Sequence, residues 1–391
     1  MWARILTFAV VSTLISGLLH RYLWARLVRD AALPAPWSRA LTIAAIALVF
    51  LVPAAELASR TLPRAIARPI AYVGFGWLGI LFYAFAFLVV ADVVRLLIGL
   101  VPHAQAAATA APVDVERRAL FGRGVALVAS VAAAGVGTWG MVNAAREVAV
   151  KPVRVALARL PKGLDGLVVV QLSDIHIGPT LGREFLEEIV RQTNALLPDV
   201  IAITGDLVDG SVALLREQVA PLAGLRARHG VFFVTGNHEY FSGADAWIAE
   251  LTRIGVRVLR NERVELRVGE DVIDLAGVDD PTARRLDGHG PDLDRALAGR
   301  DQARELILLA HQPKAIFEAA AKGVGLQLSG HTHGGQLWPW RYLVYLQQPY
   351  VMGLHRHGEA QIYVSRGTGY WGPPMRVGAS AEITKLTLVR A

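Results

Sequence analysis

The chain has 391 residues, of which 53% are hydrophobic, and it contains no cysteine; its mean hydropathy is +0.40. The lack of cysteine excludes disulfides, thiolate-bound zinc and a cysteine nucleophile, so a metal would have to be held by His, Asp, Glu or Asn. The length allows two domains, and the hydropathy is too high for an ordinary soluble enzyme, so we expect part of the chain to lie in a membrane.

The net charge of +7 is confined to the first part of the chain. Residues 1–150 hold 13 arginines and 6 acidic residues, whereas residues 151–391 hold 27 basic and 27 acidic residues. Basic residues that flank apolar segments serve membrane topology. The C-terminal part therefore has no excess of positive charge for binding nucleic acid, and no nucleic-acid partner is expected.

Four apolar stretches come first in the chain, at residues 5–19, 41–58, 70–94 and 124–145. A bilayer core is crossed by about 20 apolar residues in a helix. We therefore expect a membrane region of about four helical spans at residues 1–150, followed by a second domain at residues 151–391. The first stretch alone could instead be a signal peptide, and residues 102–112 read as an alanine-rich linker.

Two features of the sequence bear on the orientation of these spans in the membrane. Eight basic residues flank the spans on one side and seven on the other, which barely decides under the positive-inside rule. The pair Arg117-Arg118 before the fourth stretch resembles a twin-arginine export signal, although an arginine pair before a span is common. Both hints favour a multi-pass protein of the plasma (inner) membrane with its C-terminal domain outside the cytoplasm.

The second domain alternates short apolar runs with amphipathic segments. Strands are predicted at 167–172, 200–203, 231–234, 306–309, 326–328, 361–365 and 383–389, helices at 181–197, 214–228 and 244–254, and a hairpin at 263–276. Pro221 should break the second helix. Strands alternating with helices predict an α/β domain with a mostly parallel central sheet.

Residues that can bind metal follow the ends of these predicted strands. The five blocks are Asp174-Ile175-His176, Gly205-Asp206 with Asp209, Asn237-His238-Glu239, His311, and His331-Thr332-His333. Each block alone has an ordinary structural explanation, such as a helix cap or a turn. Together, at the carboxyl ends of strands where α/β folds bind ligands, they predict a metal centre.

Two of the blocks place ligand types two residues apart. Because side chains at i and i+2 point the same way along an extended chain, Asp174 and His176 could hold one ion, and His331 and His333 could do the same. Neighbouring glycines would let the backbone approach the metal without a Cβ clash.

This ordered pattern resembles the calcineurin-like metallophosphoesterase superfamily over about residues 165–390. The flanking sequences Gly277-Val278-Asp279-Asp280, Gly334-Gly335-Gln336 and Val364-Ser365-Arg366-Gly367 resemble its bacterial membrane-associated YkuE-type branch and transmembrane proteins with a metallophosphoesterase domain. The resemblance implies a four-layer αββα sandwich with two central sheets.

The resemblance also implies the roles of the site residues. The first metal would be held by Asp174, His176, Asp206 and His333, and the second by Asp206, Asn237, His311 and His331. His238 would be the acid beside the scissile phosphate, and Asp206 would serve both metals. Asp209 and Glu239 would orient ligands, although Asp209 could instead be an acid at a helix N-terminus.

The chemistry of such a centre is consistent with phosphate-ester hydrolysis. Two dications about 3.5–4 Å apart can activate a bridging hydroxide and stabilise the attacking and leaving oxygens. The two carboxylates and one hydroxide leave net positive charge for an anionic substrate. Mixed nitrogen and oxygen ligands favour two ions of Mn, Fe or Zn.

The substrate is indicated by the apolar and aromatic segment 337–357, which could be a lipid-facing lip or a loop packed on itself. With the membrane region it favours hydrolysis of a phosphate ester or pyrophosphate bond in a phosphorylated lipid or a lipid-linked nucleotide such as UDP-2,3-diacylglucosamine. Two alternatives stay open: a general, nuclease-like phosphodiesterase, and a catalytically inert membrane sensor or scaffold.

Overall fold

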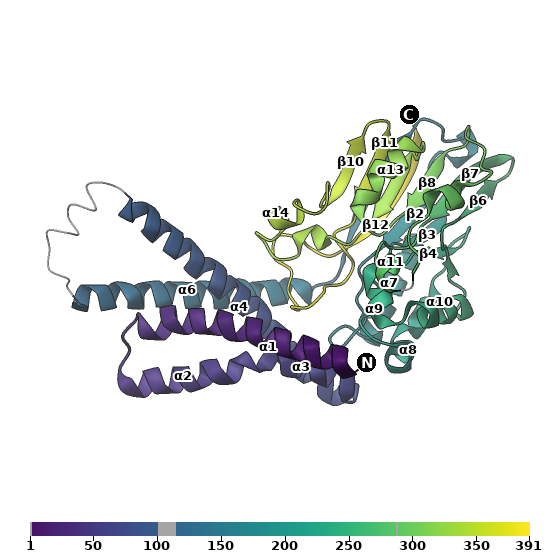
Figure 1. Ribbon diagram of the computed structural model, residues 1–391. Coiled ribbons are helices and arrows are strands. Elements are labelled where there is room, and N and C mark those ends of the chain that lie inside the picture. Colours follow the sequence, from purple (N-terminus) through teal and green to yellow (C-terminus); the bar gives the residue numbers. More distant parts are fainter. Residues whose placement is uncertain (1, 101–114, 287) are drawn as a thin grey trace. The chain divides into compact units, whose positions relative to one another are not determined.

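The computed structural model describes residues 2–100, 115–286 and 288–391 (Figure 1). The chain forms two compact units. One extends to Val142 and includes Gly372–Met375, and the other comprises Asn143–Trp371 and Arg376–Ala391.

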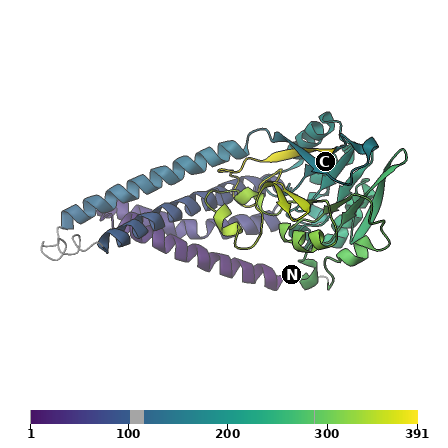
Figure 2. The ribbon, with the colours of Figure 1, turned by 90° about the horizontal axis from the view of Figure 1, so that it is seen from above.

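The first unit is entirely helical among its described residues. It contains α1 (Trp2–Trp24), a π-helical turn (Ala25–Arg29), α2 (Ala35–Val49), α3 (Leu51–Thr61), α4 (Arg64–Gly99) and α6, which runs from Val115 to Ala144. Helix α6, blue in Figure 2, is unbroken over 30 residues.

Three segments of the described residues are long and apolar enough to cross a membrane: Ala35–Thr61, Arg64–Gly99 and Glu116–Ala144. They contain the second and third predicted stretches and all of the fourth except its last residue. The first stretch lies in α1, of which the side chains of residues 2–6 and 8 are outside the description, so the expected total of about four spans stays a prediction. The predicted linker at residues 102–112 also lies outside the described residues.

Polar side chains within this unit pair with one another, as apolar surroundings require. The hydroxyl of Tyr22 donates to Asp92 Oδ2 over 2.8 Å, and Arg26 pairs with the same carboxylate. His20 donates from Nδ1 to the carbonyl of Ser16 (2.8 Å) and accepts from Trp77 Nε1 (3.0 Å). The bonds to Asp92 and from Trp77 thus connect the N-terminal helical segment to α4 at two positions along α4.

The second unit contains two six-stranded sheets, each built mainly from parallel pairs. The first sheet has the order β1 (Ala149–Leu157), β12 (Glu382–Arg390), β2 (Val168–Leu172), β3 (Val200–Ile203), β4 (Val231–Phe233), β5 (Arg257–Val258). The second has the order β10 (Gly353–His357), β11 (Ala360–Val364), β9 (Leu326–Ser329), β8 (Leu306–Leu309), β7 (Asp271–Gly277), β6 (Glu262–Val268). Only the pairs β12–β2, β10–β11 and β6–β7 are antiparallel among the described strands.

Successive residues of a buried strand point to opposite faces of the sheet and pack in different hydrophobic cores. These cores separate the layers of the domain. In β3, Ile201 and Ile203 pack in the core that also contains Leu186 of α7 (Arg183–Ala195), whereas Val200 and Ala202 pack between the two sheets. The second sheet alternates likewise, and its outer face packs against α12 (Leu293–Leu297) and α13 (Ile316–Ala321).

The resulting arrangement is a four-layer αββα sandwich (Figure 1). The first sheet is covered by α7, α8 (Val212–Val219) and α10 (Ala244–Arg253). The architecture implied by the resemblance is therefore confirmed, whereas strand counting alone predicts a single central sheet.

Some local features of the second unit agree with the sequence prediction, and three strands were missed by it. Helix α8 ends at Val219 and continues as a 3-10 turn (Ala220–Gly224), as expected around Pro221. The hairpin β6–β7 forms around Gly269 as expected. Three strands were not predicted: β1, β5 and β10. β5 has two residues, and β1 and β10 carry charged or imidazole side chains that obscure an apolar run.

Candidate metal centre

The predicted ligand residues follow strands of both sheets at their carboxyl ends. The loops after β2, β3 and β4 supply Asp174, Asp206 and Asn237 from the first sheet, and the loops after β8 and β9 supply His311 and His331 from the second. Backbone bonds join neighbouring loops, because Asp174 N donates to the Gly205 carbonyl and Gly330 N to the His311 carbonyl, both over 3.0 Å. The sandwich thus brings together residues up to 157 positions apart in sequence, namely Asp174 and His331.

Five of these residues have left-handed backbone conformations. The φ angles are 51° for Asp174, 53° for His176, 53° for Asp206, 71° for His331 and 51° for His333. Such conformations are uncommon for residues with a side chain and cost about 1–3 kcal/mol each. The expectation that i and i+2 ligands project from extended chain is therefore wrong: turned backbone beyond the strand ends directs these side chains to the centre.

Two glycines are required by close packing in this region. A Cβ at Gly330 would overlap Ser173 and Asp174, and a Cβ at Gly236 would overlap Asp206. The backbone of two loops therefore contacts the carboxylates directly. The expected approach of this backbone to a metal stays a prediction.

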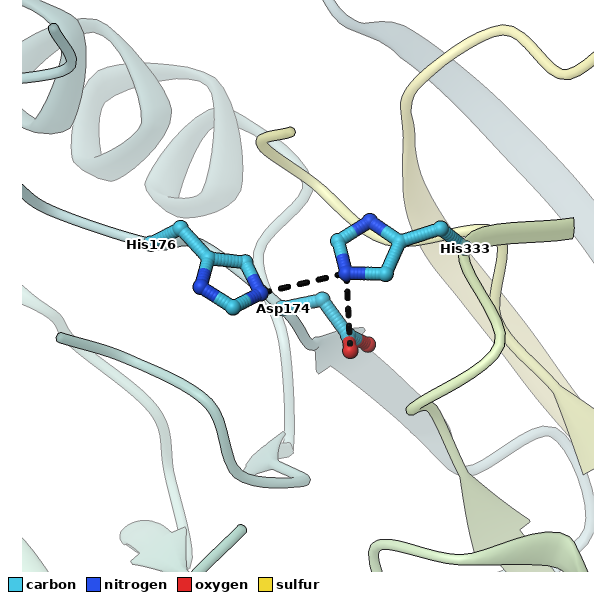
Figure 3. Close-up of side chains that lie close together, drawn as sticks. All are labelled: Asp174, His176 and His333. Carbon is cyan, nitrogen blue, oxygen red and sulfur yellow. Dashed lines mark hydrogen bonds and ion pairs between the residues drawn. The ribbon is translucent and has the colours of Figure 1, made fainter. Parts of the chain in front are cut away.

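One group of ligand atoms is formed by Asp174, His176 and His333 (Figure 3). The Nε2 atoms of the two histidines are 3.1 Å apart, and His333 Nε2 is 3.5 Å from Asp174 Oδ1. Asp206 Oδ2 approaches the same group at 3.9 Å from His176 Nε2. These four residues are the set expected for the first metal.

A second group forms around the same carboxylate oxygen. Asp206 Oδ2 lies 3.1 Å from His311 Nε2, which is 3.2 Å from both Asn237 Oδ1 and His331 Nδ1. Asn237 Oδ1 is also 3.0 Å from His331 Nδ1. These four residues are the set expected for the second metal.

The donor chemistry of the second group fits a cation. His311 Nδ1 donates to the Thr204 carbonyl over 2.8 Å, so in the neutral ring Nε2 bears a lone pair. That nitrogen faces Asp206 Oδ2 and Asn237 Oδ1, which are both acceptors. In this neutral form the electron pairs of three side chains converge, which suits a divalent ion. Burial lowers the pKa of His311, but the charge of Asp206 outweighs burial and raises it, so an ion would take the place of a proton on Nε2.

Asp209 organises two histidines at the edge of the centre. It accepts from His176 Nδ1 at 3.1 Å and from His238 Nδ1 at 2.6 Å. Burial disfavours its charge, but the two histidines outweigh burial and lower the pKa of Asp209. A carboxylate on Nδ1 fixes the tautomer that leaves His176 Nε2 free for a metal, so the geometry matches an orienting residue better than an acid at the N-terminus of α8.

Glu239 shapes the loop that carries Asp206. Its carboxyl accepts from the backbone N–H groups of Asp206 (3.0 Å), Leu207 (2.8 Å) and Gly236 (2.7 Å). Burial, reinforced by the charge of Asp206, raises the pKa of Glu239 to about 7. Glu239 therefore holds the backbone of two ligand loops without facing the metal positions.

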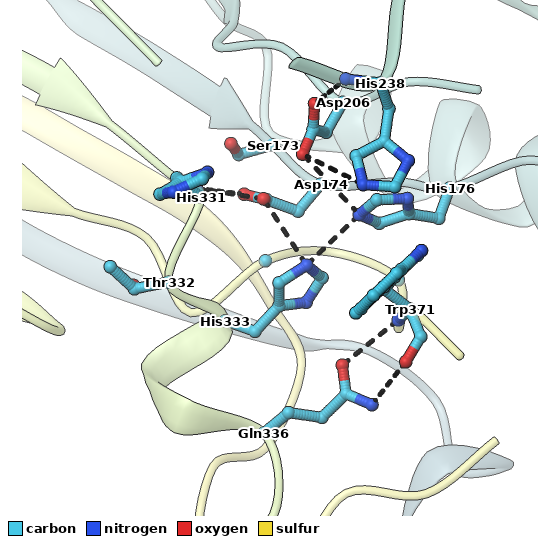
Figure 4. A network of polar contacts seen from close by, with 12 residues as sticks. Ser173, Asp174, His176, Asp206, His238, His331, Thr332, His333, Gln336 and Trp371 are labelled. Atoms are coloured by element: carbon cyan, nitrogen blue, oxygen red, sulfur yellow. Dashed lines mark hydrogen bonds and ion pairs between the residues drawn. The ribbon is translucent and has the colours of Figure 1, made fainter. Parts of the chain in front are cut away.

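His238 lies in the first turn of helix α9 (Asn237–Ser242), beside the two groups. Its backbone N–H donates to Asp206 Oδ1 over 2.9 Å, and its Nε2 lies 4.0 Å from Asp206 Oδ2. Burial opposes protonation of the ring, but Asp206 and Asp209 outweigh burial and raise the pKa of His238 to about 9. A protonated Nε2 pointing to the centre (Figure 4) can act as a general acid.

The family is decided by comparison with known proteins. The calcineurin-like phosphoesterase family matches residues 167–335, which include all the candidate ligands. An uncharacterized metallophosphoesterase of Aquifex aeolicus is 36% identical over 234 residues, covering 59% of this chain and 87% of the relative. The chain belongs to the calcineurin-like metallophosphoesterases.

Two further relatives match the predicted branch. The metallophosphoesterase YkuE of Bacillus subtilis is 34% identical over 237 residues, covering 59% of this chain and 81% of the relative. A transmembrane protein with metallophosphoesterase domain from Bos taurus is 47% identical over 264 residues, covering 64% of this chain. The matched region spans 60% of that relative's length.

One positioning residue of the metallophosphoesterase domain escaped sequence reasoning. Arg376 is buried, and its Nη1 donates to the carbonyls of His333 (3.0 Å) and Arg366 (2.7 Å). It fixes the backbone of a candidate ligand from a loop 43 residues later. A lone arginine in a loop carries no periodic signal, so only the contact reveals this role.

Replacing Asp206 should remove more metal than replacing Asp174. We expect Asp206→Asn to lose both ions and more than about 10²-fold in activity, the upper range for outer ligand partners, because one carboxylate faces both groups. Asp174→Asn should lose one ion. Metal analysis of the purified full chain checks this, and equal stoichiometry in the two variants would contradict the shared role.

Replacing His238 should lower turnover without removing metal. We expect His238→Gln to slow hydrolysis of an alkyl ester by roughly 10²–10⁴-fold, the usual contribution of a general acid, and to slow a p-nitrophenyl ester less, because that leaving group needs less protonation. His355→Gln, on β10, is the control. Loss of an ion would instead make His238 a ligand together with His176 and Asp206, which also lie within ligand distance of one another.

Proposed function

We propose that the protein is a membrane-anchored, dinuclear metal-dependent phosphoesterase. The observation that carries this proposal is the position of Asp206 Oδ2, 3.1 Å from His311 Nε2 in one group of ligand atoms and 3.9 Å from His176 Nε2 in the other. Two divalent ions, with Mn, Fe or Zn best suited to these mixed donors, would activate water and stabilise the oxygens of a phosphate undergoing substitution.

The residues of the chain would divide the remaining work. Asp174, His176, Asp206 and His333 would hold one ion, and Asp206, Asn237, His311 and His331 the other. His238 would donate its Nε2 proton to the leaving oxygen, while Asp209 would hold the ring through Nδ1 at 2.6 Å. Buried Glu239 and Arg376 would keep the ligand loops in place.

We propose an amphiphilic substrate: a phosphorylated lipid or a lipid-linked nucleotide resembling UDP-2,3-diacylglucosamine. The segment after His333 exposes large apolar and aromatic side chains, namely Trp338, Trp340, Tyr342, Leu343, Tyr345 and Leu346. Helix α14 (Arg341–Val344) in this segment buries none of its residues, which argues against a loop packed on itself. Trp and Tyr are the residues that favour the membrane interface.

A short tether supports the same substrate class. Four residues separate the end of α6 at Ala144 from the start of β1 at Ala149, and an extended chain spans at most about 3.6 Å per residue. When α6 crosses a bilayer, the metallophosphoesterase domain is held close to lipid headgroups, where a lipid-linked phosphate would be abundant.

The function is tested by a substrate screen with the purified full chain. We expect a phosphorylated lipid or UDP-linked lipid to be hydrolysed faster than DNA, with p-nitrophenyl esters as general reporters. A chelator should abolish hydrolysis and added Mn²⁺ should restore it, and Asp206→Asn is the inactive control. Preference for DNA would instead indicate a nuclease-like enzyme, and no hydrolysis by a metal-loaded chain would indicate a sensor or scaffold.

We further propose that the domain faces away from the cytoplasm of the plasma (inner) membrane. Eight basic residues flank the spans on the opposite side and seven on the side of this domain, and the more basic side is expected to be cytoplasmic. A fusion of alkaline phosphatase after Ala391 should be active, and a fluorescent protein that matures only in the cytoplasm should stay dark at the same position. A bright fluorescent fusion would reverse the orientation.

A further inference from the structure

Two aromatic rings flank His238 outside the groups of candidate ligand atoms. The ring of Trp371 lies 5.5 Å from the His238 ring at 72°, and that of Phe241 lies 5.7 Å away at 78°. His176 makes the corresponding edge contact on the metal side, at 4.7 Å and 89°. Trp371 and Phe241 nevertheless remain 54% and 65% exposed, so each offers free apolar surface next to the proposed acid.

Trp371 is held in place by a dedicated pair of hydrogen bonds. The Gln336 amide donates from Nε2 to the Trp371 carbonyl (2.8 Å), and its Oε1 accepts from the Trp371 N–H (3.0 Å), as Figure 4 shows. Gln336 directly follows the 3-10 turn His333–Gly335 and has a φ of 43°. The turn that carries a candidate ligand therefore also fixes the position of Trp371.

The two rings lie where the leaving group of a substrate would bind. A general acid contacts the leaving oxygen, so side chains around the open side of His238 contact the leaving group rather than the phosphoryl group. Covering a large exposed aromatic ring with an apolar group lowers the free energy of the complex, because apolar surface is removed from water. A polar leaving group such as a sugar hydroxyl would gain little from the same surface.

We propose that Trp371 and Phe241 form a binding surface for an apolar leaving group, and that Gln336 is the positioning residue for Trp371. The inference rests on the proposed phosphoesterase function and on His238 as the proton donor. It adds the chemical class of the leaving group, an alkyl or aryl alcohol whose carbon skeleton lies against the two rings as its oxygen accepts the proton. Of the two proposed substrates, this selects the phosphorylated lipid, because a pyrophosphate bond would release a phosphate instead.

The test uses esters that differ only in the apolar part of the leaving alcohol. Methyl, butyl, hexyl and benzyl esters of phosphate and of methyl phosphate have alkoxide leaving groups of similar basicity, and release of the alcohol is measured with the full chain in one detergent. A fully buried methylene is worth about fourfold in binding, so five partly buried ones should raise kcat/KM by roughly tenfold or more. The benzyl ester separates ring packing from chain burial.

The variants identify the surface that provides this preference. Trp371→Ala should reduce the hexyl-to-methyl ratio toward one, mainly by raising KM for the hexyl ester, while metal content stays as in the wild type. Trp371→Phe should keep most of the ratio, and Gln336→Ala should lose part of it. Phe317→Ala is the matched control, because Phe317 is an exposed ring edge-on to His357 at 5.1 Å, away from the ligand residues.

The outcomes separate this inference from the proposed function. A wild-type chain that hydrolyses all the esters at one rate overturns the leaving-group surface alone. An equal fall of kcat/KM for methyl and hexyl esters in Trp371→Ala also overturns it, as does an equal effect of Phe317→Ala. A metal-loaded wild-type chain that hydrolyses no ester overturns the proposed function itself.

Discussion

The structure of the site depends on how the Asp206 carboxylate is held between the two sheets. Its Oδ1 accepts the His238 backbone N–H at 2.9 Å, which leaves Oδ2 facing His311 and His176. Its backbone N–H donates to Glu239 and its carbonyl accepts from His176 N. The neighbours of Asp206 are thus candidate ligands, the proposed acid His238 and the orienting residue Glu239, so one carboxylate contacts every functional part of the centre.

The surrounding sandwich stabilises an arrangement that would be unfavourable by itself. Ligand residues with φ near 50–70° and buried carboxylates close together both cost free energy. The compensating burial comes from the apolar strands directly behind the loops, since β3 is fully buried and its alternate residues serve two cores. Backbone bonds between adjacent loops then leave the ligand side chains little freedom to move apart.

The distribution of apolar surface separates the two roles of the chain. Long apolar helices carry exposed Leu, Val and Phe side chains that suit lipid, together with internally paired groups such as Asp92 with Tyr22 and Arg26. In the metallophosphoesterase domain, most exposed aromatic side chains follow the ligand turn or flank His238, and Phe317 on α13 is an exception. This aromatic exposure is the basis for the proposed amphiphilic substrate, because core residues of the same domain are almost fully covered.

The sequence by itself determined the family and the order of the main strands, and it identified the candidate metal ligands. A residue that can bind metal directly after an apolar run is a feature of the local sequence, and the lack of cysteine narrows the possible ligands. The candidate ligands could therefore be predicted: Asp174, Asp206, Asn237, His311 and His331. Strand counting predicted one sheet, and the two sheets were implied only by the family resemblance. The tertiary structure alone decided that turned rather than extended backbone directs the candidate ligands and that Arg376 supports His333. It also placed Gln336 against Trp371, 35 positions later. Sequence periodicity indicates which face of a single helix or strand is buried. These contacts instead join loops that follow different strands. Their partners are determined by the packing of elements that lie far apart in the chain.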